Sequence, residues 1–234
     1  MDGAVVENVN ISDIKMKDVQ TPIFIVLGKR GRKQPGEVGE APTGKIRHVV
    51  IRNVTAVSHS KMSSSITAFP GAYIEGVVLQ HISISGMGGG TRSEANLLLK
   101  EAPAAYPENR MYGEVYPASG LFIRHVNGIT LESISLHVRN SDSRPTIILD
   151  DVTNAKLESV TTENCFPIKN SSFTSHFGRK NTTYWEDGNV SVYTSPGLPG
   201  YSSPGPSNSK TFRNASVGRN CKVLSDSSYG NVVN

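Results

Sequence analysis

The feature that most constrains this chain is an apolar motif that occurs five times. The copies begin 40, 28, 52 and 26 residues apart, and each carries small or branched apolar residues at offsets 0, 3, 5, 8 and, except in the last copy, 10. This spacing is neither that of an amphipathic helix nor the strict alternation of one long strand. The copies are VENVNISDIKM from Val6, IRHVVIRNVTA from Ile46, IEGVVLQHISI from Ile74, VNGITLESISL from Val126 and VTNAKLESVTT from Val152.

The spacing within the motif predicts a bent strand. Offsets 3 and 5, and then 8 and 10, are two short segments with period 2 separated by one extra residue. A strand with this pattern turns and resumes with its apolar face still inward. Val and Ile, which favour strands, supply most of these positions. The shortest spacings predict a unit of 26 to 28 residues, which is the size of one turn of a solenoid.

A second set of β-rich runs lies between the motif copies, so each coil combines a motif, a turn and another strand. Stacked coils of this kind bury one continuous apolar column. We therefore predict an all-β parallel β-helix of about five to six coils; a leucine-rich repeat would require an LxxLxLxxN spacing that is absent. The second-set runs are PIFIVLG from Pro22, SSITAFPG from Ser64, NLLLK from Asn96, GLFIRHV from Gly120 and PTIILDDV from Pro145.

The predicted organisation is a stack of coils over residues 1–168 followed by an irregular tail over residues 169–234, which is rich in Ser, Asn, Gly and Pro. Two insertions interrupt the coils. Residues 28–44 are rich in Gly, Pro and charge, and residues 86–120 combine a glycine run with three tyrosines. Long loops on a rigid solenoid form one wall of a binding groove or remain surface decoration, and the sequence leaves both alternatives open.

The composition and charge of the chain exclude few classes of function. The 234 residues carry a net charge of +4, which alone does not separate a nucleic-acid partner from an acidic polysaccharide. No apolar run approaches the roughly 18 residues of a membrane span, and the residues after Met1 contain no apolar signal core. Cys165 and Cys221 could bridge or stay as thiols, and no ligand spacing accompanies them. We expect no metal ion and no cofactor. Six sequons weakly favour secretion; they begin at Asn10, Asn53, Asn170, Asn181, Asn189 and Asn214.

Several stretches over roughly residues 3–162 resemble family 28 of the glycoside hydrolases, the polygalacturonases and their pectin-degrading relatives. The likeness is to the later coils of that family. The stretches that carry it are VVENVNISDIKMKDVQTPIFIVLGKR, TGKIRHVVIRNVTA, SSITAFPGAYIEGVVLQHISISGMGGG, AYPENRMYGEVYPASGLFIRHVNGITLESISL and RPTIILDDV.

This resemblance implies a right-handed parallel β-helix, an acidic pectic polysaccharide of the galacturonan type as partner, and a secreted, extracellular or periplasmic location. It implies no nucleic acid and no membrane. The family hydrolyses its substrate with aspartates in NTD and DD motifs, assisted by GHG and RIK motifs, and the sequence contains no NTD, GHG or RIK. We therefore expect a shortened form of such an enzyme that lacks the catalytic half and self-associates through its exposed N-terminal coil.

The adjacent Asp150 and Asp151 could be mistaken for the DD motif, because paired carboxylates are what glycoside hydrolysis requires. Neighbouring strand residues point to opposite faces, so the two side chains share a site only if the backbone bends between them. We interpret the pair as the corner of a coil and assign no catalytic residue. The histidines within or beside the repeats are interpreted as stacked or outward-facing residues; they are His48, His81 and His125.

Lys29 and Arg30 are the predicted substrate-binding residues. They follow the run PIFIVLG, in the coil directly after the one where the family's RIK motif would lie. A guanidinium can hold a uronate carboxylate with two hydrogen bonds, although a solvated basic loop is the competing interpretation. Tyrosines of the second insertion could stack on sugar rings or anchor the loop; they are Tyr106, Tyr112 and Tyr116.

Three functional hypotheses follow. The first is a polygalacturonase-like hydrolase of family 28, inactive as this chain alone. The second is a non-catalytic solenoid that binds pectin or serves at a surface without cleaving. The third is a polysaccharide lyase, which usually needs an acidic calcium site beside a basic residue; no such cluster is evident in the sequence.

Overall fold

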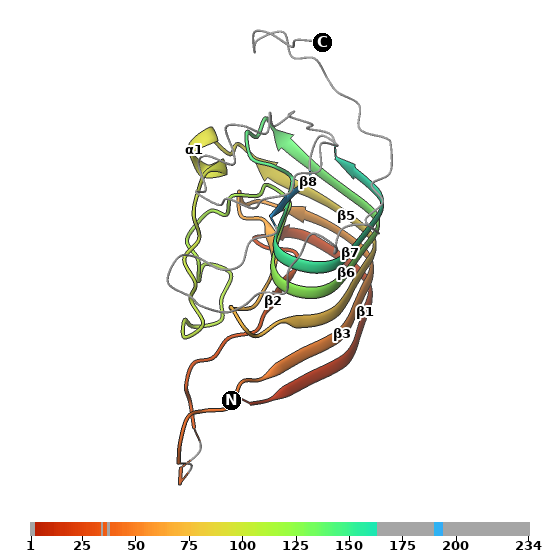
Figure 1. Cartoon of the computed structure of the whole chain (residues 1–234). Coiled ribbons are helices and arrows are strands. Elements are labelled where there is room, and N and C mark those ends of the chain that lie inside the picture. Colours follow the sequence, from red (N-terminus) through yellow and green to blue (C-terminus); the bar gives the residue numbers. More distant parts are fainter. Residues whose placement is uncertain (1–2, 34, 37, 163–189, 194–234) are drawn as a thin grey trace.

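The structure is a computed structural model that describes residues 3–33, 35–36 and 38–162, together with the backbone of residues 190–193. It consists of parallel strands that curl around an apolar interior, with one short helix in the described part (Figure 1). The prediction of a mostly β fold with parallel strands is confirmed. The elements are β1 (Val5–Val19), β2 (Phe24–Val26), β3 (Lys45–Ser58), β4 (Ser64–Thr67), β5 (Ile74–Gly88), α1 (Arg92–Ala95), β6 (Leu121–Asn140), β7 (Ile147–Thr162) and β8 (Val190–Tyr193).

The long strands stack in the order in which the motif repeats. β1 pairs with β3, β3 with β5, β5 with β6 and β6 with β7, all in parallel. The register matches the five-copy alignment, because Val6 pairs with Ile46, and Ile74 pairs with Val126, which in turn pairs with Val152. The short strands β2 and β4 and the first part of β6 form a second parallel run that continues into β7 and β8.

Each long strand bends where the motif has its extra residue. At offset 7 every copy has a non-glycine residue with φ between 53° and 60°, in the left-handed region where L-residues are uncommon. Offset 2 is also left-handed in all five copies and holds glycine in two of them. The predicted bend at offset 7 is therefore confirmed. The second bend, at offset 2, accounts for the three-residue spacing between the apolar residues at offsets 0 and 3. The offset 7 residues are Asp13, Asn53, His81, Ser133 and Ser159.

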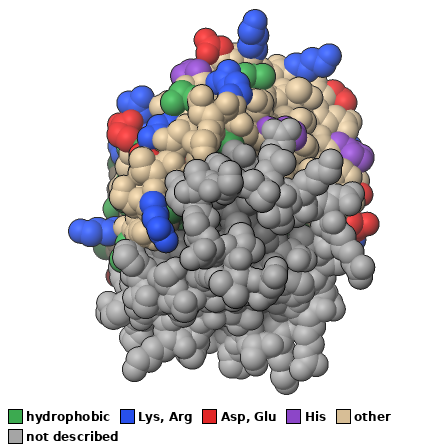
Figure 2. Space-filling view, turned by 90° about the horizontal axis from the view of Figure 1, so that it is seen from above, with side chains coloured by type: hydrophobic (Ala, Val, Ile, Leu, Met, Phe, Trp, Pro, Cys, Tyr) green, Lys and Arg blue, Asp and Glu red, His purple; other side chains and the backbone are tan. Residues whose placement is uncertain are grey.

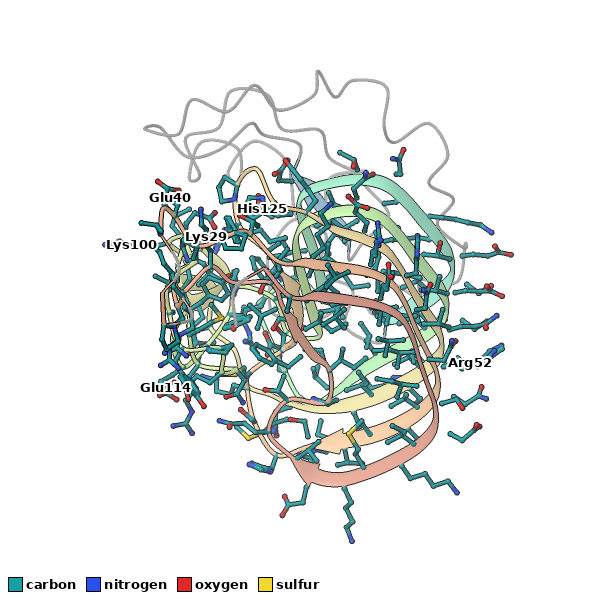
Figure 3. All side chains as sticks on the ribbon, turned by 90° about the horizontal axis from the view of Figure 1, so that it is seen from below. Lys29, Glu40, Arg52, Lys100, Glu114 and His125 are labelled. Carbon is teal, nitrogen blue, oxygen red and sulfur yellow. The ribbon has the colours of Figure 1, made fainter. Side chains whose placement is uncertain are left out.

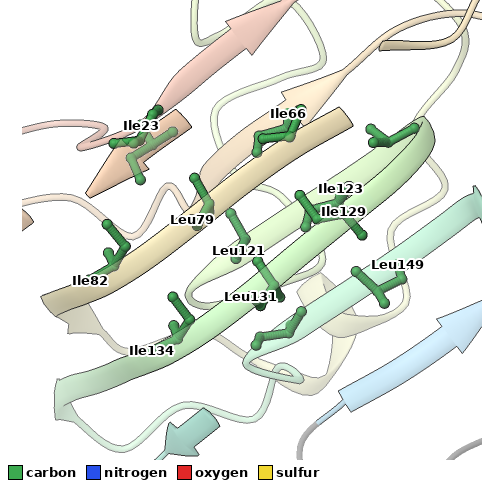
Figure 4. Packing of buried hydrophobic residues seen from close by; sticks show 14 of the residues in the cluster. Ile23, Ile66, Leu79, Ile82, Leu121, Ile123, Ile129, Leu131, Ile134 and Leu149 are labelled. Atoms are coloured by element: carbon green, nitrogen blue, oxygen red, sulfur yellow. The ribbon is translucent and has the colours of Figure 1, made fainter. Parts of the chain in front are cut away.

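The apolar interior is built from the motif positions and from the inward residues of the second strand set (Figure 4). In β5 and β6 the residues at offsets 0, 3, 5 and 8 are at most 1% exposed. Ile66 of β4, Ile123 at the start of β6 and Leu149 at the start of β7 close the column from the other side. Burial of this continuous column is the main force that holds the strands in stack.

A second, smaller apolar cluster lies on the outer side of the short strands. Residues 89–120, which we call the strap, connect β5 to β6 and pass over this side of the molecule (Figure 1). Tyr116 is fully buried there, makes an edge-to-face contact with Phe122, and donates a hydrogen bond to the carbonyl of Asn109 at 2.8 Å. The strap is thus packed onto the sheet.

Two further expectations meet the structure at particular segments. The run NLLLK was predicted as a strand, and this is wrong: the chain there forms α1 up to Ala95 and then continues without regular structure through Lys100. Thr91 and Glu94 make reciprocal capping hydrogen bonds that favour the helical turn. β8 lies within the predicted irregular tail and pairs with β7. Cys165 and Cys221 lie outside the described residues.

Candidate functional site

A pocket with basic walls lies where β1, β2 and the strap meet. Its volume is about 320 Å³. We call it the basic pocket because Arg30, Arg32 and Lys45 line it, and no carboxylate occurs among its described lining residues. The lining residues are Ala4, Val6, Val26, Leu27, Gly28, Arg30, Arg32, Gly44, Lys45, Ile46, Ala105, Pro107 and Met111.

Backbone hydrogen bonds hold the walls of the basic pocket together. After β2, the amide of Leu27 donates to the carbonyl of Thr67 at 2.9 Å, and the amide of Lys29 donates to Pro103 of the strap at 2.6 Å. At the opposite wall, the amide of Lys45 donates to the carbonyl of Ala4 at 2.9 Å. These bonds tie the segment after β2 to Thr67 and to the strap, and the start of β3 to the segment before β1, so the pocket does not depend on side-chain contacts alone.

The structure separates the two predicted substrate-binding residues. Arg30 lines the basic pocket, and its guanidinium carbon lies 4.9 Å from the centre of the Tyr106 ring, a cation–π geometry. Lys29 lies beside the pocket, and its ammonium is 3.4 Å from the carboxylate of Glu40, which is 94% exposed. Arg30 therefore lines the pocket, whereas Lys29 is directed to Glu40.

The three tyrosines of the strap also have separate roles. Tyr106 is 65% exposed and stands at the basic pocket with Arg30. Tyr112 and Tyr116 pack edge to face in the smaller apolar cluster. The anchoring interpretation thus applies to Tyr112 and Tyr116, and a ring able to stack on a sugar remains at Tyr106.

Lys45 is a pocket residue that was not singled out from the sequence. It is the first residue of β3 and pairs with Val5 at the start of β1. The alignment of the first two motif copies already places these two residues side by side, one position before offset 0. The sequence did not reveal that the residues after β2 lie next to Lys45, and for this reason Lys45 was not predicted as a pocket residue.

A second group of charged residues is buried at the corner where β6 and β7 begin their motif copies. The Arg124 guanidinium donates to Asp150 at 2.7 Å and to Glu101 of the strap at 3.3 Å. His125 contacts Asp151 through Nδ1 at 2.6 Å and Glu101 through Nε2 at 3.1 Å. All five side chains are at most 9% exposed. We call these five residues the buried network.

The buried network favours the charged form of its basic members. Burial alone would lower the pKa of His125, but hydrogen bonds to Asp151 and Glu101 outweigh it and raise the pKa above its usual value. The same opposition, with Asp150 and Glu101 as partners, raises the pKa of Arg124. Tyr73 donates to Asp151 at 2.8 Å, and burial together with this carboxylate raises the pKa of the phenol. Asp150 and Asp151 therefore have partners inside the fold, as does Oε1 of Glu101, whereas Oε2 of Glu101 is buried without a hydrogen bond.

Asp150 and Asp151 both belong to the buried network. Asp151 has φ 54°, so the backbone does bend at the pair and both side chains can join one network. Each is less than 10% exposed and each has a buried basic partner. The corner interpretation agrees with this geometry.

The three histidines differ in their surroundings. His48 and His81 are exposed at left-handed bends, in agreement with the outward-facing interpretation. His125 is also left-handed but points inward to two carboxylates. The alignment of the last two motif copies could have revealed this contact, because it places His125 next to Asp151 and Arg124 next to Asp150.

A further buried ion pair joins Arg144 to Asp142 at 2.7 Å, and Arg144 also donates to the carbonyls of Lys61 and Tyr116. Seen from above, Lys and Arg side chains stand among Asp and Glu along the rim of the described part (Figure 2). Arg52 points outward from a long strand, on the far side of the stack from Lys29 (Figure 3). Within the described ranges, no group of three or more His, Cys, Asp or Glu side chains could hold a metal ion. No helix in the same ranges has the length and hydropathy needed to cross a membrane.

Comparisons with models of protein families, with curated proteins and with solved structures gave no match to this chain.

Proposed function

We propose that this chain forms a right-handed parallel β-helix of the family 28 type and that it binds an acidic, galacturonan-type polysaccharide in the basic pocket. The observation that carries the proposal is the lining of the pocket: three cationic side chains, no described carboxylate and an exposed aromatic ring at its edge. A polymer of uronic acids offers the matching chemistry, with one carboxylate on each sugar ring and apolar ring faces between them.

The in-register stack supports the β-helix part of the proposal. Two sets of parallel strands run side by side, and both continue through β6 and β7. Every motif copy bends at the same two offsets. Repetition of one bent strand in one register is what a solenoid of stacked coils requires.

The pocket residues can divide the recognition of one uronate unit. A guanidinium binds a carboxylate through two parallel hydrogen bonds, a geometry available to Arg30 and Arg32. Lys45 adds a point charge from the opposite wall. The Tyr106 ring, already next to Arg30, offers a face for a sugar ring. Arg30 stacked on the ring loses less side-chain freedom when a ligand binds than a solvated arginine would.

Binding without cleavage is the activity we propose for this chain on its own. The resemblance to polygalacturonases links the protein to pectin hydrolysis, but the sequence contains no NTD, GHG or RIK motif. The one adjacent aspartate pair is buried and ion-paired in the network. We therefore propose that hydrolysis of pectic polysaccharide belongs to proteins of this type that carry those motifs.

Titration calorimetry with an oligogalacturonate tests the binding proposal. We expect a complex that weakens as salt is added, because charged contacts are screened. The double variant Arg30→Gln, Arg32→Gln should lose binding, whereas Arg52→Gln on the far side of the stack should not. Equal affinity of both variants, or equal affinity for a fully methyl-esterified fragment without carboxylates, would refute the proposal.

Reducing-sugar release from polygalacturonate tests the proposal that this chain binds the polysaccharide without cleaving it. We expect none from the purified chain. Release that is abolished by Asp150→Asn or Asp151→Asn would show that the buried pair opens and acts as a catalytic site, and the proposal of binding without cleavage would then fail.

A further inference from the structure

β1 exposes two motif positions, offsets 0 and 5, that the copies in β5, β6 and β7 bury. Val6 and Ile11, at offsets 0 and 5, are 48% and 37% exposed. Their equivalents in β5, Ile74 and Leu79, are 0% and 1% exposed. The five apolar positions of β1 therefore form an unfinished layer of the core, in the described part of the chain.

One edge of β1 has no strand partner among the described residues, and it lies on the same side as the exposed apolar layer. Among the described residues β1 pairs with β3 alone, so its other edge presents amide and carbonyl groups without strand partners. An edge of this length with apolar side chains is a template for pairing with another strand. The free edge and the exposed apolar layer face the same way, along the stack.

The apolar spacing of β1 reads the same in both directions about its central bend. Val9 and Ile11 precede the bend at Asp13, and Ile14 and Met16 follow it. Reversal of the strand about a point between Ser12 and Asp13 exchanges Val9 with Met16 and Ile11 with Ile14. A two-fold axis through that point, pointing to the middle of the coil, keeps all four side chains inward.

We propose that two copies of this chain associate through β1, with the strands antiparallel and the two-fold axis between Ser12 and Asp13. In this arrangement Val9 of one copy lies opposite Met16 of the second copy, and Ile11 lies opposite Ile14. The apolar column then continues from one stack into the other, as it does between β3 and β5. The interface is isologous and closed, which is the usual symmetry of soluble dimers.

Other pairings between two copies fit less well. A parallel pairing of the two free edges requires rotation about the strand direction, which turns the apolar side chains of one copy outward. Stacking of β1 on the other end of a second copy meets a closed surface, because Val152, Leu157 and Val160 of β7 are at most 8% exposed. The open layer of β1 is matched best by the same layer of the second copy.

Two features limit the strength of the proposed dimer. Residues 28–44 project from the stack near its N-terminal end, so they restrict the contact to the part of β1 around the bend (Figure 1). The pairing also places Glu7, which is ion-paired with Arg47, opposite Asp18 of the second copy, which contacts His59 of its own chain. Like charges directly opposite one another destabilise a pair of strands. Because the contact is small, we expect dissociation constants on the order of micromolar.

Sedimentation velocity over a concentration series tests the association. The chain should shift from monomer to dimer, and Ile11→Lys should remain monomeric because it places a charge in the interface. Val38→Lys is the matched control: Val38 is 97% exposed on the projecting loop, and the same change there should leave the dimer intact. Asp18→Asn should tighten the dimer about two- to fivefold, since it removes the repulsion with Glu7.

Cysteine cross-linking tests the register. In a background with Cys165→Ser and Cys221→Ser, a mixture of Ile11→Cys and Ile14→Cys chains should form a mixed disulfide, because directly opposite residues meet the distance that a disulfide requires. Either variant alone should cross-link poorly. A monomer at all concentrations, a dimer unaffected by Ile11→Lys, or cross-linking of Ile11→Cys to itself would overturn the proposal. Circular dichroism of each variant establishes that it is folded.

Discussion

The basic pocket and the buried network use similar residues for opposite purposes. In the network, Arg124 is 4% exposed and is matched by carboxylates on β7 and on the strap. In the pocket, Arg30 shares its wall with other cations and stacks on an exposed ring. A buried arginine surrounded by carboxylates holds the fold together, whereas an arginine that lines a pocket with other cations adds to the positive charge of that pocket. Residue type alone does not distinguish these roles; the partners do.

Loss of Arg124 should give the largest effect on stability. Arg124→Ala leaves Asp150 and Glu101 buried without their main cation, and removal of one member of a buried ion pair costs about 3–5 kcal/mol. The free energy of unfolding from urea denaturation measures this. Arg30→Ala in the pocket serves as the control and should change it by less than about 0.5 kcal/mol. Similar losses in both variants would mean that the two sites are not distinct in the way described.

The buried network should also make stability depend on pH through His125. The folded-state pKa of this residue is raised by Asp151 and Glu101, so its contribution is complete below the unfolded pKa of about 6.5 and is lost as pH rises through the folded value. Both ring nitrogens contact carboxylates, which requires the doubly protonated ring. His125→Gln should therefore destabilise the protein by about 1.5–3 kcal/mol in mild acid.

The measurement is the free energy of unfolding at several pH values for the original chain and for His125→Gln. The difference between the two should shrink as the solution becomes alkaline. His48→Gln, at an exposed bend, is the control for replacement of an imidazole outside the network. A difference that stays constant with pH would contradict the assignment of a charged His125.

In the basic pocket the effect should appear in binding and hardly at all in stability. Arg30→Gln should weaken oligogalacturonate binding about tenfold, equal to about 1.4 kcal/mol, because one bidentate contact and one stacked cation are lost. Arg124→Lys cannot serve as a control, since it disturbs the fold. Arg52→Gln removes the same charge on the far side of the stack, and titration calorimetry of both variants separates a local contact from the effect of net charge.

The ion pair beside the pocket should give the smallest effect. Lys29 and Glu40 are separated by 3.4 Å at the surface, and Glu40 is almost fully exposed. Exposed pairs of this kind contribute little, because water screens them. Glu40→Ala should leave the melting temperature unchanged and slightly strengthen oligogalacturonate binding by removing a negative charge. A clear loss of stability would show that the loop is held by this pair.

Most of the stack could be predicted from the sequence because the apolar spacing carries the register. The five-copy alignment gives the strand pairs and the bend at offset 7, and it also places His125 beside Asp151. The strap could not be predicted in this way. Glu101 reaches the network, and Pro103 reaches Lys29, through a fold of the insertion that no repeat encodes. The run NLLLK looked like a strand because Leu97, Leu98 and Leu99 are consecutive, but a helical cap just before it sets the local structure.

The candidate site was predicted only in part, because the repeat encodes the strands but not the fold of the strap. Arg30 was found because it follows a predicted strand, whereas its contact with Tyr106 of the strap could not be foreseen. Lys29 was given the same weight although it turns to Glu40. Sequence order placed both residues near the site but did not determine which of them faces it.

The gradual change in burial from β1 to β6 has a dynamic consequence. Repeating stacks unfold approximately as chains of neighbours, so opening begins where a unit has fewest contacts. Amide hydrogens of β1 should therefore exchange with solvent first, followed by those of β3, while those of β6 exchange slowest. Such a molecule unfolds progressively from the β1 end. Any partner that covers β1 would therefore slow amide hydrogen exchange in β3 as well as in the residues that it contacts.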